Sequence, residues 1–204
     1  MTLKDVGGFV GGALEGGVRK NRAVRGRDLV TLDFDSVPAG GSEEVRRRAA
    51  GLGCGYVIYS TRKHEPARPR LRLVAPLDRT ATADEYEPIA RKLAEMIGIE
   101  WCDPTTFQAA RMMYWPSVCS DGEYIFACED KPFLSADGML ALYGDWRMSP
   151  PGRRCRGRRR SVRWRADRRT PRPRPGVVGA FCRRLRRPAG DGTLPPRRLR
   201  VGGR

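Results

Sequence analysis

Short apolar runs of β-favouring residues recur along most of the chain and predict a set of strands. The clearest run is Leu29-Val-Thr-Leu32. By this pattern we expect strands over residues 28–35, 55–60, 70–77, 111–116 and 124–128. Leu71, Leu73 and Ala75 fall on one face of their strand, because successive side chains point to opposite sides. The chain is therefore expected to form a sheet with one apolar face.

Three further segments have the sequence features of helices. Residues 42–52 begin with a hydroxyl and two acids, which favour a helix start. Residues 82–97 begin with the capping box Thr82-Ala-Asp-Glu85 and are followed by Gly98, a typical helix end. A last short helix is expected over residues 136–143. The order β-α-β-β-α-β-β-α predicts an α+β or α/β sheet with helices on one side.

The two ends of the chain differ in composition from this central part. Residues 1–27 contain three Gly pairs followed by a basic stretch, which disfavours a stable helix. We expect a flexible leader there, or alternatively a loop whose backbone approaches phosphates. Residues 148–204 are rich in Arg, Pro and Gly without a hydrophobic period, and we expect this tail to be disordered. The folded core is thus predicted over residues 28–147.

The charge of the chain is concentrated in the tail. The formal net charge is +17, a value typical of nucleic-acid binders. Residues 1–148 nevertheless hold 20 basic and 21 acidic side chains, whereas residues 149–204 hold 20 Arg and two acids. The tail is either a nucleic-acid-binding arm or a frame-shifted end of the gene, because GC-rich codons read out of frame yield Arg, Pro and Gly.

The cysteines and the apolar runs limit the class of protein. The six cysteines lack CxxC spacing and the chain has one histidine, which argues against a structural zinc site. Isolated cysteines are typical of a reduced, cytoplasmic protein. No apolar run approaches the ~20 residues of a membrane span, and no signal peptide is evident. We expect a cytoplasmic protein without membrane contact.

Candidate chemistry begins at the end of the first predicted strand. Asp33 and Asp35 are two residues apart, so both carboxylates project to the same side of the strand. Their mutual repulsion favours a cation between them, and Mg²⁺ or Mn²⁺ prefers such hard oxygen ligands. Paired ions of this kind serve phosphoryl transfer. The alternative is a pair of solvated acids at a strand end.

Basic side chains on the neighbouring strands suit phosphate. Arg70 and Arg72 alternate along the third predicted strand. The segment after the second strand contributes Ser60, Arg62, Lys63 and His64. Asp103 is a candidate third metal carboxylate, with a turn residue before Pro104 as the alternative. Arg111 begins the next predicted strand and lies eight residues after Asp103.

Several sequence strings resemble a known family. They are Tyr59 to Val74, Pro76-Leu77, Asp84 to Pro88 and Asp103 to Ser117. Together they resemble the N-terminal primase region of phage and prophage replication proteins of the virulence-associated E type. That family belongs to the archaeo-eukaryotic primase superfamily. The resemblance extends over about residues 9–146.

The resemblance implies an α+β fold with an RRM-like mixed or antiparallel sheet and helices packed on it. It also implies a DNA primase-polymerase, a template-dependent nucleotidyltransferase that uses two divalent ions in prophage or mobile-element replication. Its partners would be a DNA template, nucleoside triphosphates and a replicative helicase or ATPase. In this scheme Asp33, Asp35 and Asp103 hold Mg²⁺ or Mn²⁺. The family pattern implies that Ser60 and His64 contact the incoming nucleotide, with His64 counted among the catalytic residues beside the three acids. The phosphates would be held by Arg62, Lys63, Arg70, Arg72 and Arg111.

Two features depart from the family pattern. Arg62 stands where the family often has the first of two histidines, so Arg62 would have to supply the phosphate contact. The chain also lacks the GxxxxGK[ST] string of the ATPase domain that commonly follows. Two further hypotheses stay open, the second because paired acids also serve nuclease chemistry. One is a non-catalytic or decayed nucleic-acid-binding prophage protein, and the other is a metal-dependent nuclease.

Overall fold

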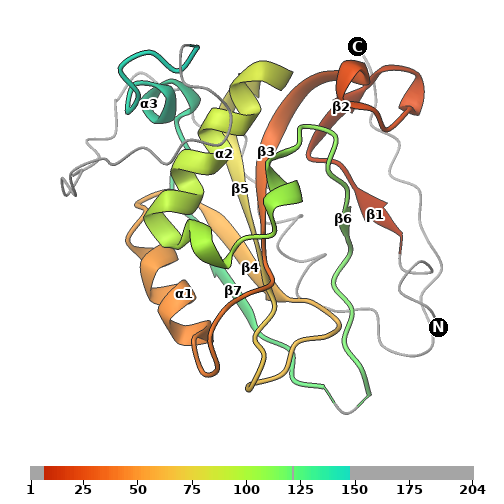
Figure 1. The fold of residues 1–204 in the computed structure, drawn as a ribbon, viewed down its shortest axis with the longest axis vertical. Coiled ribbons are helices and arrows are strands. Elements are labelled where there is room, and N and C mark those ends of the chain that lie inside the picture. The colour runs from red at the N-terminus through yellow and green to blue at the C-terminus, as the bar shows by residue number, and fades with distance from the viewer. Residues whose placement is uncertain (1–6, 121, 148–204) are drawn as a thin grey trace.

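The structure, a computed structural model, describes residues 7–120 and 122–147. A five-stranded antiparallel sheet with the order β2-β3-β5-β4-β7 forms its centre, and β1 pairs with β6 beside it (Figure 1). The strands are β1 (Gly8–Phe9), β2 (Gly12–Leu14), β3 (Val24–Phe34), β4 (Tyr56–Ser60), β5 (Leu71–Ala81), β6 (Met113–Tyr114) and β7 (Phe126–Glu129). The α-helices are α1 (Ser42–Ala50), α2 (Ala83–Ile97) and α3 (Ala136–Leu140). Short 3₁₀ turns are η1 (Glu15–Gly17), η2 (Asn21–Ala23), η3 (Ile99–Trp101) and η4 (Pro104–Phe107).

The helices cover one face of the sheet, as Figure 1 shows for α1 and α2. The apolar side chains of β3 and β5 that face them are fully buried, Leu71, Leu73 and Ala75 among them. Helix α2 begins with the predicted capping box, since Thr82 Oγ1 accepts from the Glu85 amide at 3.3 Å and Glu85 Oε2 accepts from the Thr82 amide at 2.8 Å. The predicted α+β class is confirmed, because the ladders between the described strands are antiparallel.

The opposite face of the sheet carries a mixed set of side chains. Val57, Tyr59 and Val74 form a second, smaller apolar cluster there, covered by half-buried residues that include Phe9 and Trp115. The rings of Phe9 and Trp115 lie 4.6 Å apart, which joins the chain beside β1 to the chain beside β6. This face also carries the charged residues of the candidate site.

The start of β3 pairs with β2 at its outer edge, and the end of that edge is covered by the segment that follows α2. The amides of Asp35 and Asp103 donate to Trp101 O at 3.0 Å and to Asp33 O at 2.8 Å. Thr106 Oγ1 lies between two groups of the strand, donating to Thr31 O at 2.8 Å and accepting from the Asp33 amide at 3.2 Å. The strand end that carries the candidate acids is therefore hydrogen-bonded on both sides.

The prediction of a flexible leader over residues 1–27 is wrong for residues 7–27. These residues form β1, β2, η1, η2 and the start of β3. Its glycines allow close approach of neighbouring strands. A Cβ on Gly12 would lie 2.0 Å from Gly26 O, and one on Gly8 would lie 2.7 Å from Met113 O. The Gly pairs thus serve strand pairing, which their helix-breaking character does not reveal.

Other expectations differ from the structure in extent. The strand expected over 111–116 is limited to the two residues of β6, and the strand expected over 70–77 continues to Ala81 in β5. The tail, predicted to be disordered or frame-shifted, lies outside the described residues. Within the described ranges, no helix combines the length and the apolar character needed to span a bilayer.

Candidate functional site

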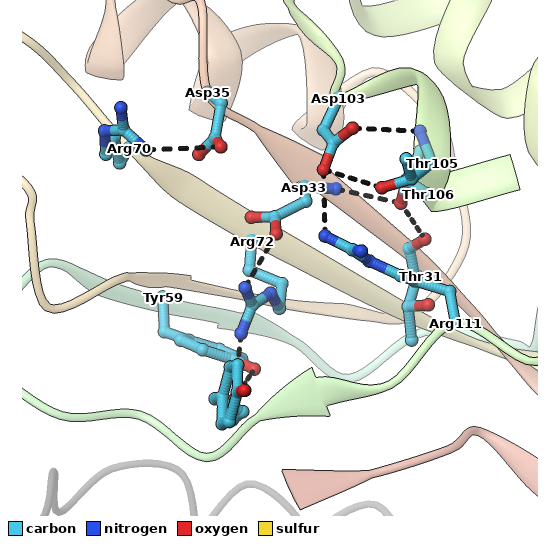
Figure 2. A network of polar contacts seen from close by, with 11 residues as sticks. Thr31, Asp33, Asp35, Tyr59, Arg70, Arg72, Asp103, Thr105, Thr106 and Arg111 are labelled. Atoms are coloured by element: carbon cyan, nitrogen blue, oxygen red, sulfur yellow. Dashed lines mark hydrogen bonds and ion pairs between the residues drawn. The ribbon is translucent and has the colours of Figure 1, made fainter. Parts of the chain in front are cut away.

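A buried ion pair joins the end of β3 to the start of β5. Asp33 and Arg72 are register partners in the β3–β5 ladder, so their side chains leave the same face of the sheet. Arg72 Nη2 donates to Asp33 Oδ2 at 2.8 Å, and both side chains are less than a tenth exposed (Figure 2). Arg72 Nη1 donates to Tyr114 O at 2.8 Å, and its guanidinium lies 5.7 Å from the Tyr59 ring centroid.

The charge of Arg72 is fixed by this pairing. Burial disfavours the charge on Arg72, but Asp33 and Tyr59 outweigh burial and raise the pKa of Arg72 above its usual value. Asp33 Oδ2 is thus held by a permanent cation, whereas Asp33 Oδ1 is buried without a hydrogen-bond partner among the described residues. The site keeps one unused carboxylate oxygen.

A second, more open pair lies beside the first. Arg70 Nη1 is 3.2 Å from Asp35 Oδ2, and the Asp35 side chain is 36% exposed. Burial raises the pKa of Asp35 above its usual value, and the negative charges of Asp33 and Asp103 raise it further, against the opposing effect of Arg70. The three acids therefore lie close enough to repel one another, as Figure 2 shows.

Asp103 forms the third pair and caps η4. Its Oδ1 accepts from the Thr105 amide at 2.9 Å, and its Oδ2 accepts from Thr105 Oγ1 at 2.8 Å and from Arg111 Nη2 at 2.9 Å. Both oxygens of Asp103 are occupied in this arrangement. Asp103 thus lies in a turn before Pro104, which was the alternative to a metal ligand, and its charged partner is Arg111.

Two adjacent cavities open on this face. The first, here called the carboxylate pocket, has a volume of about 210 Å³. It is lined by Asp33, Asp35, Tyr59, Thr61, Arg62, Lys63, Arg70, Arg72, Tyr114, Trp115 and Ser117. The second, here called the basic pocket, has a volume of about 510 Å³. It is lined by Arg62, Lys63, His64, Glu65, Arg68, Arg70, Cys119 and Gly122. Three cationic residues, Arg62, Lys63 and Arg70, belong to both pockets.

His64 is held in one orientation at the basic pocket. Its side chain is buried, and Nδ1 accepts a hydrogen bond from the Arg70 amide at 3.1 Å. Burial lowers the pKa of His64, which favours the neutral ring. Because Nδ1 is an acceptor, the neutral ring carries its proton on Nε2. That N–H is buried and has no partner among the described residues.

Ser60 does not line either pocket. Its hydroxyl accepts from the Ile125 amide at 2.9 Å and donates to Glu123 O at 3.4 Å, so it fastens the segment before β7. The neighbouring Thr61 lines the carboxylate pocket instead. Sequence reasoning missed Tyr59 and the backbone of Tyr114, although the alternation along β4 places Tyr59 on the face of Arg72.

Buried polar atoms without hydrogen-bond partners among the described residues occur at the candidate site residues. Buried side-chain polar atoms without a partner occur at five positions of the described chain. They are Asp33 Oδ1, His64 Nε2, Arg70 Nε, Arg72 Nε and Arg111 Nε. Buried polar groups are nearly always satisfied in folded proteins, so each exception calls for an explanation. All five belong to residues that the sequence had already indicated as site residues.

A divalent cation fits part of this arrangement. Within the part of the chain that the structure describes, no three His, Cys, Asp or Glu residues converge as a ready metal site. Asp33 Oδ1 and Asp35 nevertheless offer hard oxygens in mutual repulsion. Mg²⁺ is often held by one or two carboxylates, with the other positions taken by water and substrate phosphates. The residues present thus suit a cation at Asp33 and Asp35 more readily than at Asp103.

Comparisons with known proteins gave a family match and a similarity to a solved structure. The VapE N-terminal domain family matches residues 1–150 of this chain. Among solved structures, the chain is similar to the AEP domain of the primase-polymerase of cyanophage S-2L. That similarity has 12% identity and a TM-score of 0.48, and it covers 66% of this chain and 68% of the other. No curated protein matches the chain.

Proposed function

This chain belongs to the VapE N-terminal domain family, and from that premise we propose that it is a template-dependent nucleotidyltransferase of the primase-polymerase kind, acting in phage or prophage DNA replication. One observation carries the proposal: the five buried polar atoms that lack a partner among the described residues all belong to residues that the sequence predicted for the site. Such unmet capacity suits a site completed by a metal ion and a polyphosphate.

In this proposal Asp33 and Asp35 hold Mg²⁺ or Mn²⁺. When bound, the ions would stabilise the attacking hydroxyl and the leaving phosphate oxygens. The metal role predicted for Asp103 would require that Asp103 leave Thr105 and Arg111. In the arrangement described, Asp103 instead adds negative charge beside Asp35 and orients Arg111.

The nucleotide phosphates would occupy the basic side of the site. Arg62 and Lys63 line both pockets and make no ion pair with another described residue, so their charges are available to an anion. His64 Nε2 supplies a neutral donor. Arginine forks match phosphate oxygens in geometry, so Arg62 can serve where the family often has a histidine. The predicted nucleotide contact of Ser60 would need its hydroxyl to leave the segment before β7.

The remaining partners follow from the same proposal. We propose a DNA template and nucleoside triphosphates as ligands, and a replicative helicase or ATPase, as a domain or as another protein, as the replication partner. The cytoplasm is the proposed location. The free thiols of Cys54, Cys102, Cys119 and Cys128 support a reducing compartment.

A second candidate is nucleic-acid binding without catalysis. One observation favours it: each of the three acids is already paired with an arginine, which reduces its attraction for a cation. The two proposals differ in whether the activity depends on a divalent metal ion. Binding alone would persist without a divalent ion, whereas synthesis would require one.

A primer-synthesis assay tests the proposed function. The full chain is given a single-stranded template, labelled nucleotides and Mg²⁺ or Mn²⁺. We expect synthesis by the wild type and a loss of about a hundredfold or more in the double variant Asp33→Asn/Asp35→Asn. Equal activity of the two proteins would exclude the assignment. Incubation with DNA and Mg²⁺ but without nucleotides separates the nuclease hypothesis, because only a nuclease shortens the DNA.

A further inference from the structure

Arg70 stands at the boundary between the two pockets and lines both of them. We propose that Asp35 and an anion in the basic pocket compete for the guanidinium of Arg70. Arg70 would thereby couple cation binding at the acids to anion binding in the basic pocket. The inference deepens the proposed function and rests on it for the class of anion, a polyphosphate such as a nucleotide carries.

The backbone of Arg70 is fixed, so only its side chain needs to move. The Arg70 amide donates to His64 Nδ1 at 3.1 Å, and Arg70 O accepts from the Thr61 amide at 3.0 Å. These bonds close the connection between β4 and β5 at its base. A change of partner by Arg70 can therefore occur by rotation of the side chain, without opening the sheet.

The neighbouring arginine lacks this freedom. Arg72 is enclosed by Asp33, Tyr114 O and the Tyr59 ring, and its side chain is 8% exposed. The Arg70 side chain is 21% exposed, its contact with Asp35 is longer, and its buried Nε has no partner among the described residues. Arg70 therefore has both the space and the unused donor that a second ligand requires.

The basic pocket offers the features of an anion site. Arg62, Lys63 and Arg68 contribute positive charge to its wall, and Glu65 is the acid among the described residues that line it. His64 belongs to the same wall and keeps a buried N–H without a partner. A polyphosphate would satisfy this N–H and gain the Arg70 fork once Asp35 releases it.

The consequence is a linkage between two ligands. A cation on Asp35 would neutralise the carboxylate that holds Arg70 and so free Arg70 for the anion. By thermodynamic reciprocity, an anion that captures Arg70 would leave Asp35 free for the cation. The coupling would operate through one side chain, in addition to any direct contact between the two ligands.

The coupling can be tested without metal. The full chain is titrated with inorganic tripolyphosphate in the presence of EDTA, and binding is followed by the ring resonances of His64, the single histidine of the chain. These resonances report on the basic pocket, so binding to the arginine-rich tail does not interfere. The proteins are the wild type, Asp35→Asn, Arg70→Gln and the double variant.

We expect Asp35→Asn to bind tripolyphosphate on the order of tenfold more tightly than the wild type, because Arg70 is released. Arg70→Gln should bind more weakly, and Asp35→Asn should have no further effect in the Arg70→Gln background. A matched control, Asp137→Asn, removes an exposed negative charge that is paired with Arg79 and lines neither pocket, and it should leave affinity nearly unchanged.

Two results would overturn the proposal. In the first, Asp35→Asn improves binding equally with and without Arg70, which would mean that only the loss of negative charge matters. In the second, the His64 resonances do not respond in any of the proteins. Either result is distinct from failure of the proposed function, because the titration uses neither metal nor template. Primer synthesis could occur without this coupling, and the coupling could exist without synthesis.

Discussion

Two buried arginines lie at opposite ends of the β3–β5 ladder and are held in different ways. Arg27, opposite Ala81, is fully buried and donates to Leu29 O, Ala109 O, Thr31 Oγ1 and Tyr86 Oη. Arg72, opposite Asp33, is held by a carboxylate and one carbonyl.

The difference appears in the electrostatics of the two groups. Burial lowers the pKa of Arg27, which pairs with neutral oxygens and lies 4.1 Å from the Tyr86 ring centroid. The pKa of Arg72 is raised by Asp33 despite similar burial. Arg27 belongs to a network in which Thr31 and Tyr86 also bond to one another, whereas the Arg72 pair leaves Asp33 Oδ1 without a partner among the described residues. Neutral acceptors suit a permanent structural arginine, and an ion pair with spare atoms suits a ligand site.

The largest expected effect is that of Arg72→Met. The substitution leaves Asp33 buried without a cation, which we expect to lower the free energy of unfolding by about 3–5 kcal/mol. Chemical denaturation at pH 7 measures this change. The double variant Arg72→Met/Asp33→Asn should recover much of the loss, because it removes the buried negative charge. A single variant as stable as the wild type would mean that Asp33 is hydrated and not buried.

Arg27→Met is expected to cost less. It leaves neutral carbonyl and hydroxyl oxygens without a donor, and we expect a loss of about 2–3 kcal/mol in the free energy of unfolding. Arg27→Lys serves as a control, because it keeps the charge but supplies fewer donors. Its free energy of unfolding should lie between those of the wild type and Arg27→Met. If Arg27→Met were more destabilising than Arg72→Met under the same denaturation conditions, the distinction between the two arginines would be wrong.

The smallest expected effect concerns the partly exposed Asp35. Its pKa is raised in the folded protein, so the folded state favours the protonated carboxyl, and stability falls as the pH rises from about 4 through that pKa. Asp35→Asn removes this cost. We expect a gain below about 1 kcal/mol at pH 7, because solvent screens the group. The gain should vanish near pH 4, and a gain that grows as the pH falls would contradict the argument.

The parts of the fold that could be predicted depend on local signals. The capping box of α2 and the alternation along β5 are encoded within a few residues, and both were correctly located. The folding of residues 7–27 was missed because it depends on contact between Gly12 and Gly26 across two strands. Glycine carries no hydrophobic period, so this pairing has no counterpart in the sequence pattern.

The sequence indicated charged residues of the candidate site but could not predict how they pair. Charged residues at Asp33, Asp35 and the third strand were evident from alternation alone. Their pairing depends on the β3–β5 register, which places Asp33 opposite Arg72 and cannot be read from segments so far apart in sequence. The tautomer of His64 likewise depends on the Arg70 amide, whose position follows from the folded loop.

The segment over the outer edge of β3 has a consequence for association between molecules. An exposed strand edge is a template on which another chain can add a strand, and such edges promote aggregation. The hydrogen bonds from Asp103 and Thr106 leave no room for an added strand beside Asp33. The outermost strands β2 and β7 are three and four residues long, and such short edges are poor templates. The charged strand end can therefore stay accessible to small ligands without becoming a point of self-assembly.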